Sequence, residues 1–153
     1  MEEKTPLYCK LVEHKKKDPI SFHVPGHKNG EVFPAVARKD FSSILKLDMT
    51  EIAGLDDLHA PTEAIAEAEK LAARYFGADS TFFLVGGSTA GNLAMILAVC
   101  RSGEKIIVQQ NSHKSIMNAL ELCKAQPVFL APEYDQEVSR YTHPSITTLH
   151  QTL

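Results

Sequence analysis

The sequence predicts an α/β fold, and three features of its second half support this prediction. Residues 81–85, 105–109 and 127–130 are short runs rich in apolar, aromatic and β-branched side chains, as buried strands require. Between these runs, residues 88–101 and 113–123 have the composition and spacing of helices. Strands that alternate with helices predict a parallel sheet with right-handed crossovers.

A glycine turn joins the first predicted strand to its helix. Gly86 and Gly87 end the strand, and Ser88 and Thr89 are residue types that begin helices. A helix start leaves backbone N–H groups unpaired and carries partial positive charge, so this turn is suited to hold a phosphate. The same turn occurs in many folds without a ligand, and that alternative stays open here. Neither a Walker lysine nor a GxGxxG motif is present, which argues against nucleoside-triphosphatases and dinucleotide binding.

His113 lies between the second predicted strand and the helix that follows it. The carboxyl ends of parallel strands open on one edge of the sheet, where ligands bind. We therefore expect His113 and the turn at residues 86–89 to lie at the same edge. A phosphate cradle with an imidazole nearby indicates a phosphorylated aromatic cofactor.

Further helices are predicted on both sides of this region. Residues 62–76 carry apolar side chains at helical spacing, and Gly77 supplies the C-terminal stop. Residues 5–12 are expected to form a short amphipathic helix, and Ser145 to begin a last one. Residues 33–47 show mixed helical spacing, and after Pro132 the pattern fades.

Two polar segments of the first half have open interpretations. A Pro-Gly pair separates His23 from His27, so the two histidines do not share a helix face as they would in a zinc protease. A plain surface loop is the more ordinary interpretation of this segment. Asp56 and Asp57 form either a cation site or, more commonly for such a pair, a helix cap or a solvated turn.

Composition bounds the class of protein. The chain has 153 residues, 44% of them hydrophobic, and a formal net charge of −3, so no bulk attraction to nucleic acid or anionic membranes is implied. No apolar run approaches the roughly 20 residues of a membrane span, and the N-terminal residues do not resemble a signal peptide. The 3 cysteines lack metal-ligand spacing and are expected to be reduced thiols in a cytoplasmic protein.

Five ordered sequence blocks resemble the N-terminal part of the ornithine/lysine/arginine decarboxylases, a family of fold type I, pyridoxal-phosphate-dependent carboxy-lyases. The blocks are FHVPGHKNG at Phe22–Gly30, LDMTEIAGLDDLHAP at Leu47–Pro61, the helix end YFGA, LVGGSTAGN at Leu84–Asn92, and QNSHKSI at Gln110–Ile116. The resemblance implies a partial large domain of the pyridoxal-phosphate-transferase type, with three α/β/α layers and a mainly parallel sheet. Residues 61–153 would form its first part, and residues 1–60 an N-terminal arm with a loop at the substrate and cofactor edge.

The resemblance also implies a site. Gly87, Ser88 and Thr89 would hold the phosphate of pyridoxal 5′-phosphate, and His113 would stack on its pyridine ring, where a neutral imidazole face offers dispersion contact. The implied reaction is decarboxylation of arginine, lysine or ornithine to a polyamine-pathway amine by an enzyme that is at least a homodimer. The choice among the three amino acids stays open, because the pocket that measures side-chain length should draw largely on residues outside this chain.

Two parts of the family's site are not matched within these 153 residues. The resemblance implies that the aspartate facing the pyridine nitrogen and the Schiff-base lysine of a Ser-x-His-Lys segment lie later in the chain. Ser112-His113-Lys114 imitates that segment, but its position after the second predicted strand matches the ring-stacking histidine, so Lys114 is not expected to form the Schiff base. We therefore expect a fragment that is inactive alone.

Two other functions stay open. One is a non-catalytic truncated paralogue that acts as an interaction partner. The other is a different fold type I enzyme, such as an aminotransferase or a desulfurase, although the FHVPGHKNG block argues against it.

The family topology makes a structural prediction as well. It implies that later strands fill the gap between the first strand and the next two. Residues 81–85 would then stand unpaired, with Phe82 and Leu84 exposed, and the isolated chain would aggregate or dimerise. The alternative is a closed order in which residues 81–85 pair with residues 105–109.

Overall fold

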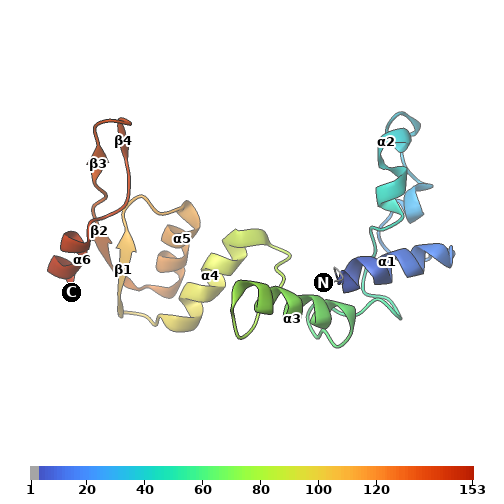
Figure 1. Ribbon diagram of the computed structural model, residues 1–153, viewed down its shortest axis with the longest axis horizontal. Coiled ribbons are helices and arrows are strands. Elements are labelled where there is room, and N and C mark those ends of the chain that lie inside the picture. The colour runs from blue at the N-terminus through green and yellow to red at the C-terminus, as the bar shows by residue number, and fades with distance from the viewer. Residues whose placement is uncertain (1–3) are drawn as a thin grey trace. The chain divides into compact units, whose positions relative to one another are not determined.

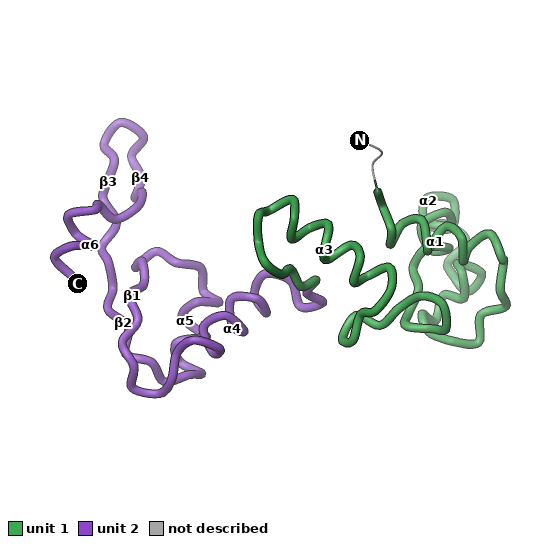
Figure 2. Tube along the Cα trace, turned by 60° about the horizontal axis from the view of Figure 1, so that its bottom comes forward, with its two compact units in different colours: residues 1–83 green, residues 84–153 purple. Residues whose placement is uncertain are grey.

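The computed structural model describes residues 4–153 and contains two compact units, which meet in sequence between Phe83 and Leu84 (Figure 2). Compactness within this chain does not define the domains of a longer protein, so the predicted domain boundary after residue 60 stays a prediction. Within the described residues, no helix has both the length and the apolar character needed to cross a membrane.

The first unit is helical (Figure 1). It contains α1 (Pro6–Lys16), the short 3-10 helix η1 (Lys28–Gly30), α2 (Ala35–Leu45) and α3 (Ala64–Phe76). Helix α1 packs against α3, and α2 packs against η1. Helix α3 ends at Gly77, whose φ of 67° is the left-handed conformation that glycine adopts at low cost, so the predicted stop is confirmed.

The second unit contains the parallel α/β element that the sequence predicts. Strand β1 (Lys105–Gln109) pairs in parallel with β2 (Gln126–Leu130), with Val108 opposite Phe129. Helix α5 (Lys114–Cys123) connects the two strands, and α4 (Gly87–Val99) packs against α5. These bounds agree with the predicted ones to within two residues. The sheet here has two strands, and three α/β/α layers stay a prediction.

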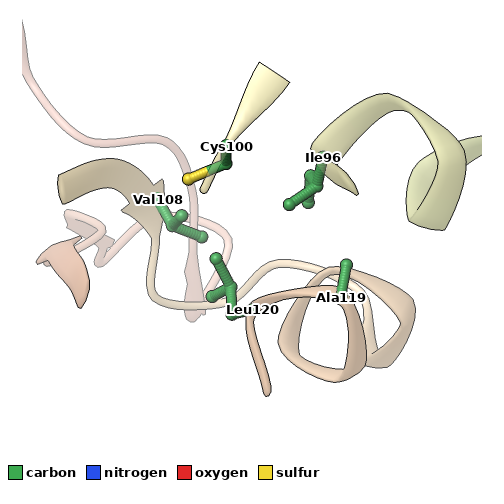
Figure 3. Packing of buried hydrophobic residues seen from close by; sticks show 5 residues of the cluster. All are labelled: Ile96, Cys100, Val108, Ala119 and Leu120. Atoms are coloured by element: carbon green, nitrogen blue, oxygen red, sulfur yellow. The ribbon is translucent and has the colours of Figure 1, made fainter. Parts of the chain in front are cut away.

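A small apolar core joins these elements (Figure 3). Its buried members come from α4, β1, α5 and the residue after α4: Ile96, Cys100, Val108, Ala119 and Leu120. Ala119 is fully buried, so α4 and α5 approach closely there. Burial raises the pKa of the Cys100 thiol, with Cys123 as a further cause, so this thiol is in its neutral, unreactive form at neutral pH.

The last part of the chain contains a hairpin that the sequence did not predict. Strands β3 (Tyr134–Asp135) and β4 (Arg140–Tyr141) pair antiparallel, and α6 (Ile146–Thr152) follows. The Asp135 side chain accepts hydrogen bonds from the backbone N–H groups of Glu137 and Val138, which stabilises the turn. An aspartate in this position is a turn signal, and it was available in the sequence. Ser145 caps α6, as predicted, by accepting from the N–H of Thr148.

The predicted strand at residues 81–85 is wrong. This segment is irregular, and β1 pairs only with β2 among the described residues. Phe82 is 76% exposed and Leu84 49% exposed. A strand is stabilised by the ladder of a neighbouring strand, and the segment has none here. The closed order is therefore not adopted, and the outcome is the unpaired segment expected from the family topology.

Candidate cofactor site

Two glycines stand at the start of α4, and each is favoured there for a different physical reason. Gly87 has a φ of +66° and open space where a Cβ would lie, so its backbone conformation is what favours glycine. A Cβ on Gly86 would lie 2.8 Å from the Cβ of Ala90, so there close packing excludes a larger residue. The glycines of this turn are therefore required by the backbone conformation and the close packing at the start of α4.

The first turn of α4 has donors for an anion. The N-cap residue Gly86 has no side chain that could cap the helix, and no acidic residue lies in the first turn. The hydroxyl-bearing side chains of Ser88 and Thr89 are exposed. Backbone N–H groups at a helix start, two hydroxyls and the helix dipole suit a phosphate dianion, so these residues fit the phosphate of the cofactor named above.

His113 begins the next helix. It is the N-cap of α5, and its Nδ1 accepts a hydrogen bond from the backbone N–H of Ser115 at 3.2 Å. The loop before it follows β1 directly, and Asn111 in that loop donates to the backbone oxygen of Thr142 at 3.2 Å. The His113 residue is exposed overall. One face of a flat cofactor ring can therefore approach it without displacing the core.

Asn92, in the second turn of α4, makes a hydrogen bond to the first turn of α5. Its Nδ2 donates to the Oγ of Ser115 at 2.8 Å, and that Oγ lies 2.8 Å from Nδ1 of His113. The structure thus packs the second turn of α4 against the first turn of α5, and the expected closeness of the turn at residues 86–89 to His113 stays a prediction. Sequence analysis gave no role to Asn92 or Ser115, although both lie in the conspicuous blocks. The available signal was Asn92 as a polar residue before the apolar run of α4.

Lys114 is exposed at the first position of α5. Its predicted lack of a Schiff-base role is untested by this geometry. The same holds for the cofactor roles of Gly87, Ser88, Thr89 and His113, which stay predictions.

The histidine loop of the first unit is ordered by its own contacts. His27 Nδ1 accepts from the N–H of Gly30 at 3.2 Å, and its Nε2 lies 3.2 Å from an oxygen of Asp48. His23 Nδ1 lies 2.6 Å from the carbonyl oxygen of Val24 and therefore donates to it. Both histidines serve the conformation of the loop. Residues 4–153 contain no group of three or more histidine, cysteine, aspartate or glutamate side chains placed to hold a metal ion.

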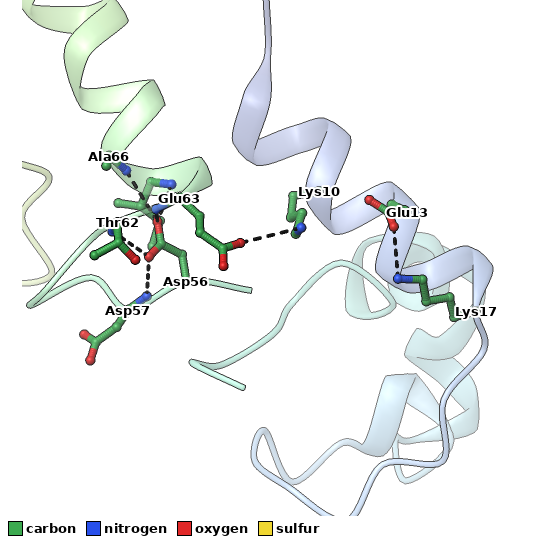
Figure 4. Close-up of polar contacts among 9 residues, drawn as sticks. Lys10, Glu13, Lys17, Asp56, Asp57, Thr62, Glu63 and Ala66 are labelled. Carbon is green, nitrogen blue, oxygen red and sulfur yellow. Dashed lines mark hydrogen bonds and ion pairs between the residues drawn. The ribbon is translucent and has the colours of Figure 1, made fainter. Parts of the chain in front are cut away.

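Asp56 is a helix cap (Figure 4). Its carboxylate accepts hydrogen bonds from five backbone N–H groups at 2.8–3.4 Å, those of Asp57, Thr62, Glu63, Ile65 and Ala66. The N–H of Thr62 is the largest cause that holds the pKa of Asp56 well below its ordinary range. Of the two interpretations of Asp56-Asp57, the structure therefore supports the cap, since both oxygens of Asp56 are occupied by donors.

The second unit, taken alone, is a parallel α/β element in which a glycine turn begins α4, an imidazole caps α5, and the two helices pack together. The chain matches the family model described as Orn/Lys/Arg decarboxylase, major domain, over residues 5–150. It therefore belongs to the Orn/Lys/Arg decarboxylase family, as the five blocks indicate.

Individual relatives agree with this assignment. The chain is 49% identical over 149 residues to the uncharacterized protein YaaO of Bacillus subtilis, covering 97% of this chain and 31% of that protein. It is 45% identical over 135 residues to an arginine decarboxylase of Bacillus cereus, covering 88% of this chain and 29% of the relative. The chain thus spans less than a third of the length of these curated relatives.

Solved structures show the same fold. The constitutive lysine decarboxylase of Escherichia coli superposes with a TM-score of 0.78 at 24% identity, over 95% of this chain and 21% of that one. Lysine decarboxylase A of Pseudomonas aeruginosa gives a TM-score of 0.66 at 32% identity, over 85% of this chain and 18% of that one. The first of these likenesses concerns the fold alone.

Proposed function

We propose that this chain is the N-terminal portion of a pyridoxal-phosphate-dependent decarboxylase that acts on arginine, lysine or ornithine. Membership of the family supports the reaction class, and relatives named for each of these three amino acids match the chain. The observation that carries the proposal is that α4, which begins at Gly87 without a side-chain cap, is hydrogen-bonded from Asn92 in its second turn through Ser115 to His113.

Each proposed site residue has a binding or orienting role. The N–H groups at the start of α4 and the hydroxyls of Ser88 and Thr89 bind the cofactor phosphate, and Gly87 allows the positive φ with which the helix begins. His113 orients the cofactor by stacking on its pyridine ring. When bound, the cofactor supplies the electron sink that lets carbon dioxide leave the α-carbon of the amino acid.

The activity of the whole enzyme needs more than residues 1–153. Because the family resemblance implies that the Schiff-base lysine lies later than these residues, we propose that residues 1–153 alone bind the cofactor weakly, form no covalent adduct and do not decarboxylate. The complete enzyme is proposed to be a homo-oligomer, at least a dimer, in the cytoplasm, with a basic amino acid as its substrate and no nucleic-acid or membrane partner.

A binding comparison tests the site. The purified chain is titrated with pyridoxal 5′-phosphate and, as matched control, with pyridoxal, which has the same ring and no phosphate. Tighter binding of the phosphorylated compound is expected, because the donors at the start of α4 act on the phosphate. Equal binding of both compounds would contradict the proposal. Reduction with borohydride followed by mass spectrometry checks that no covalent adduct forms. A stoichiometric adduct on Lys114 would show that this lysine does form a Schiff base.

A further inference from the structure

Ser115 is the buried polar residue of the described part of the chain, with 2% of its surface exposed. Three hydrogen bonds meet at it. Asn92 Nδ2 lies 2.8 Å from Ser115 Oγ, Ser115 Oγ lies 2.8 Å from His113 Nδ1, and the Ser115 N–H donates to the same Nδ1 at 3.2 Å. A buried hydroxyl with good partners on both sides is fully satisfied and therefore costs little to bury.

The chemistry of these groups fixes the position of a proton. A backbone N–H can only donate, so Nδ1 of His113 must be the acceptor and carries no proton. The amide NH₂ of Asn92 donates to Ser115 Oγ, which leaves the hydroxyl hydrogen of Ser115 to point at Nδ1. Both donors require the lone pair of Nδ1, which an imidazolium lacks. The ring of His113 is therefore the neutral form with its proton on Nε2.

Helix capping alone does not require this network. The cap of α5 consists of the hydrogen bond from the Ser115 N–H to Nδ1, and it would persist without the Ser115 hydroxyl. The Ser115 hydroxyl and Asn92 add a hydrogen bond between α5 and α4, and these two residues are 23 positions apart in the sequence. That connection ends on Nδ1 of His113, where it adds a second donor to the capping N–H, strengthens the preference for the Nε2-protonated form and limits the rotation of the ring.

We propose that Ser115, supported by Asn92, is a positioning residue that holds His113 in the neutral, Nε2-protonated form with a fixed ring plane. The proposal rests on the proposed function only in naming the cofactor ring as the stacking partner. A neutral imidazole can lie against a pyridine ring with a protonated nitrogen without the repulsion between like charges that an imidazolium would bring. A fixed plane also reduces the rotamer entropy that stacking would otherwise cost.

Nitrogen NMR of the imidazole side chains tests the tautomer without any cofactor. In the uniformly ¹⁵N-labelled chain at about pH 8, His113 is assigned by the loss of its signals in His113→Gln. We expect widely separated ring resonances, with Nδ1 as the acceptor and Nε2 as the protonated nitrogen. Ser115→Ala keeps the Ser115 N–H as a donor to Nδ1 but loses the hydroxyl, so the two resonances should move part of the way toward each other. In Asn92→Ala they should move in the same direction by less.

Matched controls separate a local effect from unfolding. Ser102→Ala removes an exposed hydroxyl of the same unit and should leave the His113 resonances unchanged. Ser115→Thr keeps a hydroxyl and should restore the wild-type pattern. Backbone amide spectra show which variants fold. If Ser115→Ala does not fold, the His113 resonances of Asn92→Ala provide the test. An unchanged His113 pattern in the folded variants overturns the inference. If the wild-type chain does not prefer pyridoxal 5′-phosphate over pyridoxal, that result contradicts the proposed function instead. The NMR result and the binding result can therefore fail separately.

Discussion

The Asp56 carboxylate accepts a hydrogen bond from the backbone N–H of Ile65 at 2.8 Å, so a residue eight positions before α3 caps the first turn of that helix. The usual N-cap position holds Glu63, whose side chain makes no capping hydrogen bond. Asp56 has a φ of 56° and also accepts from the residues that lead into α3. One carboxylate thus connects the acidic LDMTEIAGLDDLHAP block to the start of the helix.

Asp56→Asn is expected to lower the free energy of unfolding. The variant removes the charge that strengthens each of these hydrogen bonds and replaces one acceptor oxygen with a donor, which opposes an N–H group. Urea unfolding at pH 7 followed by circular dichroism measures the effect. Asp40→Asn changes an exposed aspartate of α2 and should be close to neutral. Equal midpoints for both variants and wild type would show that α3 does not depend on this cap.

The pH dependence of stability follows from the same carboxylate. Its folded-state pKa lies well below the ordinary value, chiefly because of the Thr62 N–H, so the folded chain binds fewer protons than the unfolded chain near pH 3. The stabilisation by Asp56 is therefore fully present above about pH 4, the ordinary aspartate range, and is lost as the pH falls below it. Unfolding midpoints between pH 7 and pH 2 should fall less steeply in Asp56→Asn than in wild type. Parallel curves would contradict the assignment.

Leu120→Ala is expected to destabilise the chain by about 2–5 kcal/mol, because it leaves a cavity against Ile96 and Val108 in the core. Leu122 lies in the same helix and is 63% exposed, which makes Leu122→Ala a matched control with an expected change within about 0.5 kcal/mol. Thermal or urea unfolding of the three proteins measures both values. Similar losses in the two variants would mean that α5 does not bury the predicted face.

Thr89→Ala is expected to weaken the binding of pyridoxal 5′-phosphate by about 10–150-fold, since one charge-assisted hydrogen bond is worth roughly 1.5–3 kcal/mol. In a complete enzyme that contains this segment, turnover at saturating cofactor should fall much less than affinity. Thr147→Ala, an exposed threonine of α6, is the control. An unchanged dissociation constant for Thr89→Ala would show that the turn has only a structural role.

Much of the fold could be predicted from the sequence because its causes are local. The alternation of apolar runs and helical spacing predicts β1, α5 and β2, and Gly77 ends α3 through its own backbone freedom. The glycine turn before α4 is set by residues within one turn of each other. Five ordered blocks predicted the family, which the match over residues 5–150 confirms.

The tertiary structure decided what depends on distant partners. Residues 81–85 have the composition of a strand, but a strand exists only where a neighbour completes its hydrogen bonds, and β1 pairs only with β2 in the described residues. Asp56 caps a helix through donors up to ten positions away, which no periodicity reveals. The contact of Asn92 with Ser115 joins residues 23 positions apart, so no local pattern predicts it, and only the packing of α4 on α5 supplies the donor that orients the Ser115 hydroxyl toward His113.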